Sequence, residues 1–327
     1  MRAYIANTDY DWYRHLLQVS RRPAGLDEAN FWRPSGRRVV KPAYGSPFVF
    51  KLKKQHGHAI VGFGLWAAYA RLSVEEAWQT FGEKNGAATR EAVWKRVVQY
   101  VQGLPAFPYR PTHPIGCDLI AGPVFFPEEL WIAGPADWKP NIVTGKGYEV
   151  ATGEGRRIWH ACLERAALLG PAVPLIGDPG QAEQPTLFTE TNEPERFGAP
   201  QLVRPRLGQG TFRYAVQTAY GKCAVTREHS LPALDAAHIV PVAAGGPHEI
   251  SNGLLLRADI HRLFDRGYVT VTPDYQFKVS PRLANEFDNG KVYYELEDRR
   301  LWLPKHSEHF PKREWLEQHE AEVFLKY

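Results

Sequence analysis

The sequence predicts an α+β protein of two domains. Its 327 residues correspond to two domains at about 150 residues each. Hydrophobic residues make up 44% and charged residues 23%, which is ordinary for a globular protein and excludes a disordered or fibrous chain. Strand-type runs and capped helices alternate in an irregular order and show no internal repeat, which favours mixed sheets with helices packed on them.

The segment 171–200 is predicted to be an acidic linker, because it is rich in Pro, Gly, Glu and Thr and has no sustained periodicity. It separates a first domain at 1–170 from a second at 201–327. Lys and Arg outnumber Asp and Glu by 22 to 15 in the first domain, against 17 to 16 in the second. The positive excess can receive a polyanion, although a basic surface kept for solubility explains it equally well.

The first domain is predicted to be a curved mixed sheet with helices on it. The runs 47–52 and 59–66 are β-branched and aromatic and flank a polar turn, the pattern of a hairpin. Ser73 and Glu76 have the spacing of a helical capping box. The other expected elements are strands at 4–6 and 119–126, helices at 11–17 and 89–100, and loops at 30–36 and 137–148.

The second domain is predicted to place its polar residues around two strands and a helix. A helix over 208–220 ends at Gly221, and a strand over 234–241 precedes a glycine-rich loop. A further helix begins near Ala258 and ends at Gly267, and a strand pair begins at 268. His238, Asn252 and His261 follow one another at intervals of 14 and 9 residues along this stretch.

This order, together with Cys223, the pair Gly245–Gly246 and the run 261–265, resembles the HNH (ββα-metal) nucleases. The resemblance implies a ββα-metal fold and metal-dependent hydrolysis of phosphodiesters. It gives His238 the role of the base that activates water, and it makes His261 a metal ligand with Asp265 as its partner. Asn252 is expected to brace the loop and orient the base.

Elementary chemistry agrees with these roles. Hydrolysis of a phosphodiester needs a base and a cation that neutralises the growing charge. His261 and Asp265 are four residues apart on a helix and project from one face. Many family members carry a ligand directly before the base, where this chain has Ala237. Asp235 shares the face of that position on a strand, so it is the candidate third ligand, with water and phosphate as the alternative.

One divalent metal ion is therefore expected, Mg²⁺ or Mn²⁺ before Co²⁺ or Ni²⁺. Structural zinc is not expected, because only Cys223 remains of the two cysteine pairs that many members carry. Arg262 and Arg266 are candidates to bind flanking phosphates, with a solvated helix face as an equal alternative. His229 and His248 are interpreted as loop histidines.

The order of elements in the first domain is similar to the PUA superfamily, which includes the EVE and YTH readers of modified bases. That resemblance implies a curved β-barrel with flanking helices and an aromatic pocket for an extruded base. It aligns Trp32 with the pocket tryptophan, and the further candidates are Asn30, Ser46, Trp66, Trp138 and Asn141. Packing in the core is the competing interpretation for each tryptophan.

The two domains together resemble the modification-dependent (type IV) restriction endonucleases. This implies double-stranded DNA that carries a modified cytosine, such as 5-hydroxymethylcytosine, as the partner, and defence against phage as the role. One HNH site cuts one strand, so a double-strand break requires a homodimer or two events. Alternatives are an HNH nuclease without modification dependence, a non-catalytic nucleic-acid-binding protein, and a toxin.

A cytoplasmic location is expected. The three cysteines are too few and too scattered for a disulfide framework, which suits a reducing compartment. The N-terminal residues lack the apolar core of a signal peptide, and no apolar run reaches about 18 residues, so no membrane contact is expected.

Overall fold

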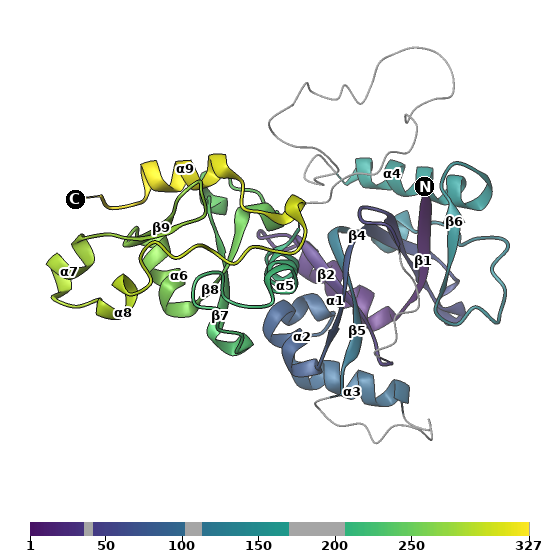
Figure 1. Ribbon diagram of the computed structural model, residues 1–327. Coiled ribbons are helices and arrows are strands. Elements are labelled where there is room, and N and C mark those ends of the chain that lie inside the picture. The colour runs from purple at the N-terminus through teal and green to yellow at the C-terminus, as the bar shows by residue number, and fades with distance from the viewer. Residues whose placement is uncertain (36–41, 102–112, 170–206, 327) are drawn as a thin grey trace, which may run out of the picture. The chain divides into compact units, whose positions relative to one another are not determined.

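The computed structural model describes residues 1–35, 42–101, 113–169 and 207–326 (Figure 1). It consists of two compact units, Met1–Gly208 and Gln209–Tyr327. The predicted α+β class is confirmed, since both units combine sheets with helices. The linker predicted at 171–200 lies outside the described residues. None of the helices in the described part of the chain is long and apolar enough to cross a membrane.

The first unit is built on a six-stranded mixed sheet with the strand order β2-β5-β4-β3-β1-β6 (Figure 1). Strands β1 and β3 pair in parallel, and the other neighbours pair antiparallel. The strand β4 shifts its register twice against β5, which bends a long strand. The bounds are β1 Arg2–Thr8, β2 Glu28–Arg33, β3 Pro47–Leu52, β4 Ile60–Leu72, β5 Ile115–Phe125 and β6 Gly145–Glu149.

Helices bury both faces of this sheet. Trp12 of α1 packs its edge against three sheet phenylalanines and donates its indole N–H to the Asn30 carbonyl oxygen at 3.1 Å. Trp159 of α4 packs edge-on against Phe63 in the core on the other face. The predicted capping box at Ser73 and Glu76 is confirmed at the start of α2. The helices are α1 Tyr10–Ser20, α2 Val74–Phe81, α3 Arg90–Val101 and α4 Gly153–Leu168.

The expectation of a loop over 30–36 is wrong for its first part, because β2 extends through Arg33 and is buried. Polar residues that suggest a loop are satisfied here by partners distant in the sequence. Glu28 is bound by Lys84, and the Asn30 side-chain amide donates to Asn85. The loop expected at 137–148 likewise runs into β6, which pairs with β1.

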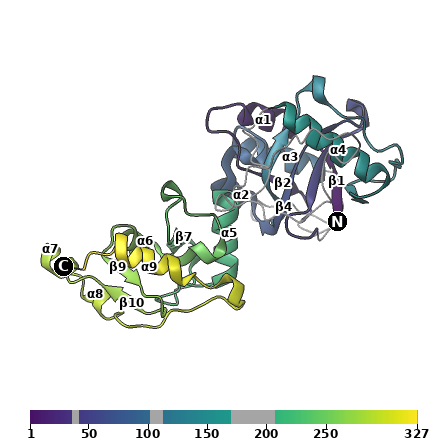
Figure 2. The same ribbon diagram turned by 90° about the horizontal axis from the view of Figure 1, so that it is seen from above.

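The second unit contains the predicted strand–strand–helix arrangement, formed by β7, β8 and α6 (Figure 1), and Figure 2 shows β7 and α6 from another side. Strands β7 and β8 pair antiparallel, and α6 begins directly after β8. Behind α6, His319 of α9 stacks on Phe264 with ring centroids 3.7 Å apart. The bounds are α5 Gln209–Tyr220, β7 Leu234–His238, β8 Gly253–Arg257, α6 Ala258–Asp265, β9 Val269–Val271, β10 Phe277–Val279, α7 Arg282–Phe287, α8 Lys291–Tyr294 and α9 Arg313–Glu322.

We expect Trp12→Ala to destabilise the first unit by about 3–5 kcal/mol, because a large buried ring is lost and a cavity remains. The side chain is 3% exposed. Urea unfolding of the full chain measures the change. Val143→Ala is the control, since Val143 is 80% exposed and its truncation should change stability by less than about 0.5 kcal/mol. A loss below about 1 kcal/mol for Trp12→Ala would contradict this account of the core.

Candidate functional site

His238 ends β7 in a setting that keeps its ring neutral. The ring stacks on Phe212 of α5, with centroids 3.9 Å apart and planes 11° apart. Its Nε2 lies 3.0 Å from Nδ1 of His248. Burial, followed by the positive charge that His248 and His261 would carry, lowers the pKa of His238 to about 4. An imidazole that is neutral at pH 7 is ready to accept a proton.

The partner of His238 was missed by the sequence interpretation, which treated His248 as a loop histidine. The two residues are ten positions apart, and no strand or helix periodicity links them. They meet only because the loop between β7 and β8 folds back on the end of β7. A histidine that follows a glycine pair in the sequence is only a weak indication of a site residue. The position of its side chain depends on the tertiary fold of the loop.

Asn252 holds this loop in place. Its side chain is fully buried. The Oδ1 atom accepts a hydrogen bond from the Val240 N–H at 2.9 Å, and Nδ2 donates to the carbonyl oxygens of Val240 and Pro247 at 3.0 and 2.9 Å. The side chain therefore joins both ends of the loop segment 240–247. This is a positioning role for the loop that places His238 beside His248.

The glycine pair explains how the loop closes. Gly245 has φ of +87°, a left-handed conformation that favours glycine. A Cβ atom on Gly246 would lie 1.9 Å from the Val240 carbonyl oxygen, so no larger residue fits. The loop therefore needs both glycines to bring its backbone against the end of β7.

His261 of α6 lies between two carboxylates. Its Nδ1 is 3.4 Å from Oδ2 of Asp235 on β7, and its Nε2 is 3.3 Å from Oδ2 of Asp265. Burial raises the pKa of Asp265; His261 opposes this rise and Asp235 adds to it. The structure thus brings together the three residues that the sequence interpretation named as candidate ligands.

The donors of this cluster suit a divalent cation, since imidazole nitrogen and carboxylate oxygen are ligands for Mn²⁺ and related ions. The donor atoms do not point to one common position, because each ring nitrogen of His261 faces a different carboxylate. Accordingly, no group of three His, Cys, Asp or Glu side chains within the described ranges forms a ready metal site. Coordination would replace one of the imidazole–carboxylate contacts.

Residues outside the predicted set support α6. Nδ1 of His319 forms a hydrogen bond with Thr270 Oγ1 at 2.9 Å, and Nε2 of the same ring lies 3.1 Å from the Phe264 carbonyl oxygen. Burial lowers the pKa of His319 to about 4. Arg262 on α6 and Arg266 directly after its end are exposed, and neither forms an ion pair with a carboxylate in the part of the chain that is described.

The six candidate base-binding residues of the first unit fall into three groups. Ser46 and Trp66 lie side by side, because the Trp66 N–H donates to the Ser46 carbonyl oxygen at 2.9 Å. The Trp66 indole donates to Oδ1 of Asp118 at 3.0 Å, and Arg33 pairs with Oδ2 of Asp118 at 2.6 Å. All four side chains are at least 90% buried.

Asp118 and Arg33 were missed from the sequence. One signal was available, the single aspartate Asp118 within the apolar run 115–125. A carboxylate on a strand that is buried on both faces needs a hydrogen-bonding or charged partner. Arg33 Nη1 has no hydrogen-bond partner within the described residues. The cluster of Ser46, Trp66, Arg33 and Asp118 is called the Asp118 cluster below.

Asn30 and Trp32 point to the opposite face of β2, because strand residues alternate and Arg33 faces Asp118. Their polar atoms bind η2, the short helix Gly82–Asn85: Trp32 Nε1 donates to the Asn85 carbonyl oxygen at 2.9 Å. Trp138 lies apart from both groups, with Lys51 Nζ 4.3 Å from its ring centroid, and Asn141 is exposed. The structure therefore does not gather the six residues into one pocket.

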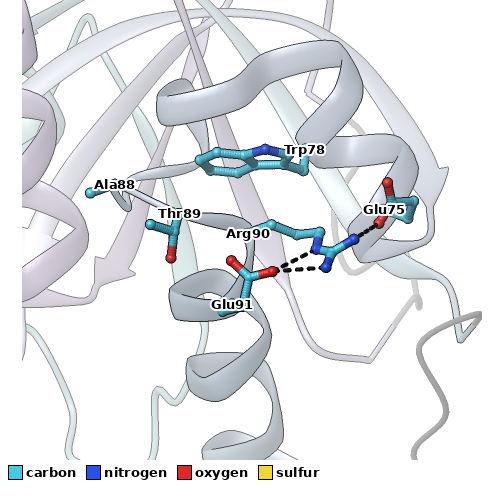
Figure 3. A pocket seen from close by; sticks show the side chains of 6 residues that line it. All are labelled: Glu75, Trp78, Ala88, Thr89, Arg90 and Glu91. Carbon is cyan, nitrogen blue, oxygen red and sulfur yellow. Dashed lines mark hydrogen bonds and ion pairs between the residues drawn. The ribbon is translucent and has the colours of Figure 1, made fainter.

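A hollow on the first unit lies between α2 and α3, lined by Trp78, Arg90 and their neighbours (Figure 3). Arg90 donates to Glu75 at 2.6 Å and to Glu91 at 2.8 Å, so its guanidinium is held by carboxylates of the same surface. These charges satisfy one another in solvent and leave no convergent polar group for a ligand.

Comparisons with known proteins assign a family to one segment of the chain and find two similar solved structures. Residues 223–272 match the family described as HNH endonuclease, so this segment, which contains His238, Asn252 and His261, is an HNH endonuclease domain. No curated protein matches the chain. Among solved structures, the chain is similar to a "Modification dependent TagI restriction endonuclease", with 19% identity, a TM-score of 0.25, and coverage of 35% of this chain and 38% of that one. It is also similar to ASCH from Zymomonas mobilis, with 12% identity, a TM-score of 0.31, and coverage of 48% of this chain and 94% of that one.

We expect the second unit to lose stability as the pH falls from about 6.5 toward 4. The pKa of His319 is near 4 in the folded chain and near 6.5 when unfolded, so in this range the unfolded state binds the additional proton. The loss from His319 alone is about 2–3 kcal/mol at pH 4.5. Urea unfolding of the full chain at several pH values measures it.

The variant His319→Gln isolates this contribution, because glutamine does not titrate. It should be less stable than the parent at pH 7, and its stability should fall less steeply between pH 6.5 and 4.5. Parallel curves for the two proteins would show that His319 is not the group responsible.

Proposed function

We propose that this chain is a modification-dependent DNA endonuclease. Its first unit would bind a modified, extruded cytosine, and its second unit would hydrolyse the phosphodiester backbone. The observation that carries the nuclease function is the HNH domain with a neutral histidine held beside a His–Asp cluster. Double-stranded DNA is the substrate, and restriction of foreign modified DNA is the corresponding role.

In this proposal His238 takes a proton from the attacking water, since its ring is neutral at pH 7. Asn252 keeps the loop and the base in register with the substrate. His261, Asp265 and Asp235 would hold one divalent cation, Mg²⁺ or Mn²⁺, which when bound neutralises charge on the phosphate and the leaving oxygen. Arg262 on α6 and Arg266 directly after its end, both exposed, would bind the phosphates on either side.

A separate reader is needed because contacts to the backbone carry little sequence information. The excess of basic residues in 1–170 supports DNA binding by the first unit. The Asp118 cluster supports base recognition there, because the buried Arg33 guanidinium, which pairs with Asp118, keeps one N–H donor at Nη1 that no described residue accepts and that a base edge would accept. Two protomers on one DNA, or two successive events, would give a double-strand break.

Replacing His238 by Ala should lower the rate of DNA cleavage by about 10²–10⁴-fold, because the base is removed. Plasmid nicking by the full chain in Mg²⁺ or Mn²⁺ measures the rate, and DNA binding should persist. His229→Ala is the matched control, since His229 is an exposed loop histidine of the same unit. Cleavage by His238→Ala at the parent rate would refute the assignment of the base.

A second pair of variants tests the reader. Trp66→Leu should reduce the affinity for modified DNA by about 5- to 150-fold and abolish the preference for it, because Asp118 loses the indole N–H that orients the cluster. Trp32→Leu, on the opposite face of β2, should retain that preference. Binding to matched duplexes with cytosine, 5-methylcytosine and 5-hydroxymethylcytosine measures both, with a thermal melt to confirm that each variant is folded.

The other outcomes are equally informative. If only Trp32→Leu loses the preference for modified DNA, the base-binding site lies on the side of β2 that contacts η2. If both variants keep the full preference, the base-binding site lies near Trp138 and Asn141. A parent protein that cuts modified and unmodified DNA alike would be an HNH nuclease without modification dependence.

A further inference from the structure

We propose that a cationic cluster around Trp302, in the second unit, binds the DNA backbone at a place separate from the catalytic residues. The cluster consists of Trp302, Lys222 and Arg227 and is called the Trp302 cluster. It rests on the proposed function for the identity of its partner. No residue of the cluster belongs to the candidate catalytic or metal-binding set.

Trp302 organises two cations on one exposed ring. Lys222 Nζ lies 3.7 Å and Arg227 Cζ 5.1 Å from its ring centroid. The ring itself is fixed, because its indole N–H donates to the Tyr220 carbonyl oxygen at 3.0 Å. Attraction to the ring offsets the repulsion between the two like charges. The tryptophan therefore holds two cationic side chains together at the surface, where 38% of its own area is exposed.

The charges of the cluster are not neutralised within the described part of the molecule, where no carboxylate forms an ion pair with Lys222 or Arg227. Glu228 follows Arg227 in the sequence, but its Oε1 accepts hydrogen bonds from the N–H groups of His229 and Ser230. The hydrogen bond from the Ser230 side chain, followed by those from the two backbone N–H groups, lowers the pKa of Glu228 to about 2. The Arg227 guanidinium itself donates only to the neutral Arg300 carbonyl oxygen, at 3.5 Å, and forms no ion pair with Glu228 in the described part of the chain, so its charge is available to an external anion.

The concentration of positive charge here is local. Residues 209–327 contain 15 Lys and Arg against 16 Asp and Glu, so the unit as a whole carries a small negative charge. Elsewhere in the unit, Lys278, Arg257 and Arg282 are paired with acidic neighbours. A general basic surface therefore does not explain the cluster.

The position of the cluster suits a second contact on the same DNA. The Ala224 N–H donates to the Leu255 carbonyl oxygen of β8, and the Trp302 N–H donates to the Ala224 carbonyl oxygen, so the cluster lies beyond the edge of β8 that faces away from β7. Tyr220, which fixes the indole, is eight residues along α5 from Phe212, the residue that stacks on His238. Phe212 and Tyr220 are about 12 Å apart along the helix axis at 1.5 Å per residue, so the cluster and His238 lie near opposite ends of α5.

The half-buried Lys222 ammonium and the exposed Arg227 guanidinium, side by side on one ring, fit the phosphates of a backbone, which both groups bind through charge-assisted hydrogen bonds. The cluster offers no buried polar group for reading a base. We therefore assign it a duplex DNA backbone as its partner, bound without sequence preference.

The test is the salt dependence of binding between the full chain and an unmodified duplex, measured in EDTA so that no cleavage occurs. Each phosphate contact contributes about 0.9 to the slope of log affinity against log salt. The double variant Lys222→Gln/Arg227→Gln should lower the slope by about 1.8. Lys312→Gln is the matched control, because Lys312 also lies over a tryptophan, Trp315, but has Glu249 within 3.6 Å. Its slope should equal that of the parent.

A double variant that is folded in a thermal melt and binds with the slope of the parent would overturn the proposal. Competition with polyglutamate gives a second test. If polyglutamate displaces the duplex from the parent protein as well as unlabelled DNA of equal charge does, the partner is any polyanion and the proposal is overturned. Plasmid nicking by the parent is measured in parallel. If the parent nicks no DNA while the double variant shows the reduced slope, the proposed nuclease function fails and the Trp302 cluster stands.

Discussion

The side-chain amide of Asn252 is the interaction on which the rest of the nuclease unit depends. It satisfies three backbone groups of the loop between β7 and β8 from a fully buried position. Without it, buried N–H and C=O groups would lack partners, which costs about 1–3 kcal/mol for each group. Because this loop carries His248 back to His238, the same three hydrogen bonds hold His248 against the His238 ring.

Two histidines of the same unit are placed in opposite surroundings. His238 is buried against an aromatic ring with a second histidine at its edge, and burial followed by the charge of neighbouring histidines favours its neutral form. His261 has a carboxylate near each ring nitrogen, a set of donors that suits a divalent cation. Separate environments for similar groups are how a site divides proton transfer from charge neutralisation. Strand β7 supplies one residue to each side, since Asp235 and His238 are three positions apart.

The sequence was informative where local periodicity fixes geometry. Alternation along a strand and the four-residue spacing on a helix place Asp235 and Asp265 toward His261, and the structure has both within 3.4 Å of its ring. It was uninformative where a partner comes from a distant segment. The polar residue Asn30 suggests a loop, because its hydrogen-bond partner Asn85 lies far away in the sequence. Arg33 and Asp118 are recognisable as a pair only after β2 and β5 are aligned. His248 was missed for the same reason.

The packing of His319 behind α6 affects when this helix is supported during synthesis. The helix with His261 and Asp265 is braced through Phe264 by a residue made more than fifty positions later. A ribosome adds residues from the N-terminus, so the first unit and the HNH segment both emerge before α9 exists. A nascent chain therefore carries His261 and Asp265 on a helix that lacks this support. The arrangement around His261 is complete only when the last helix docks.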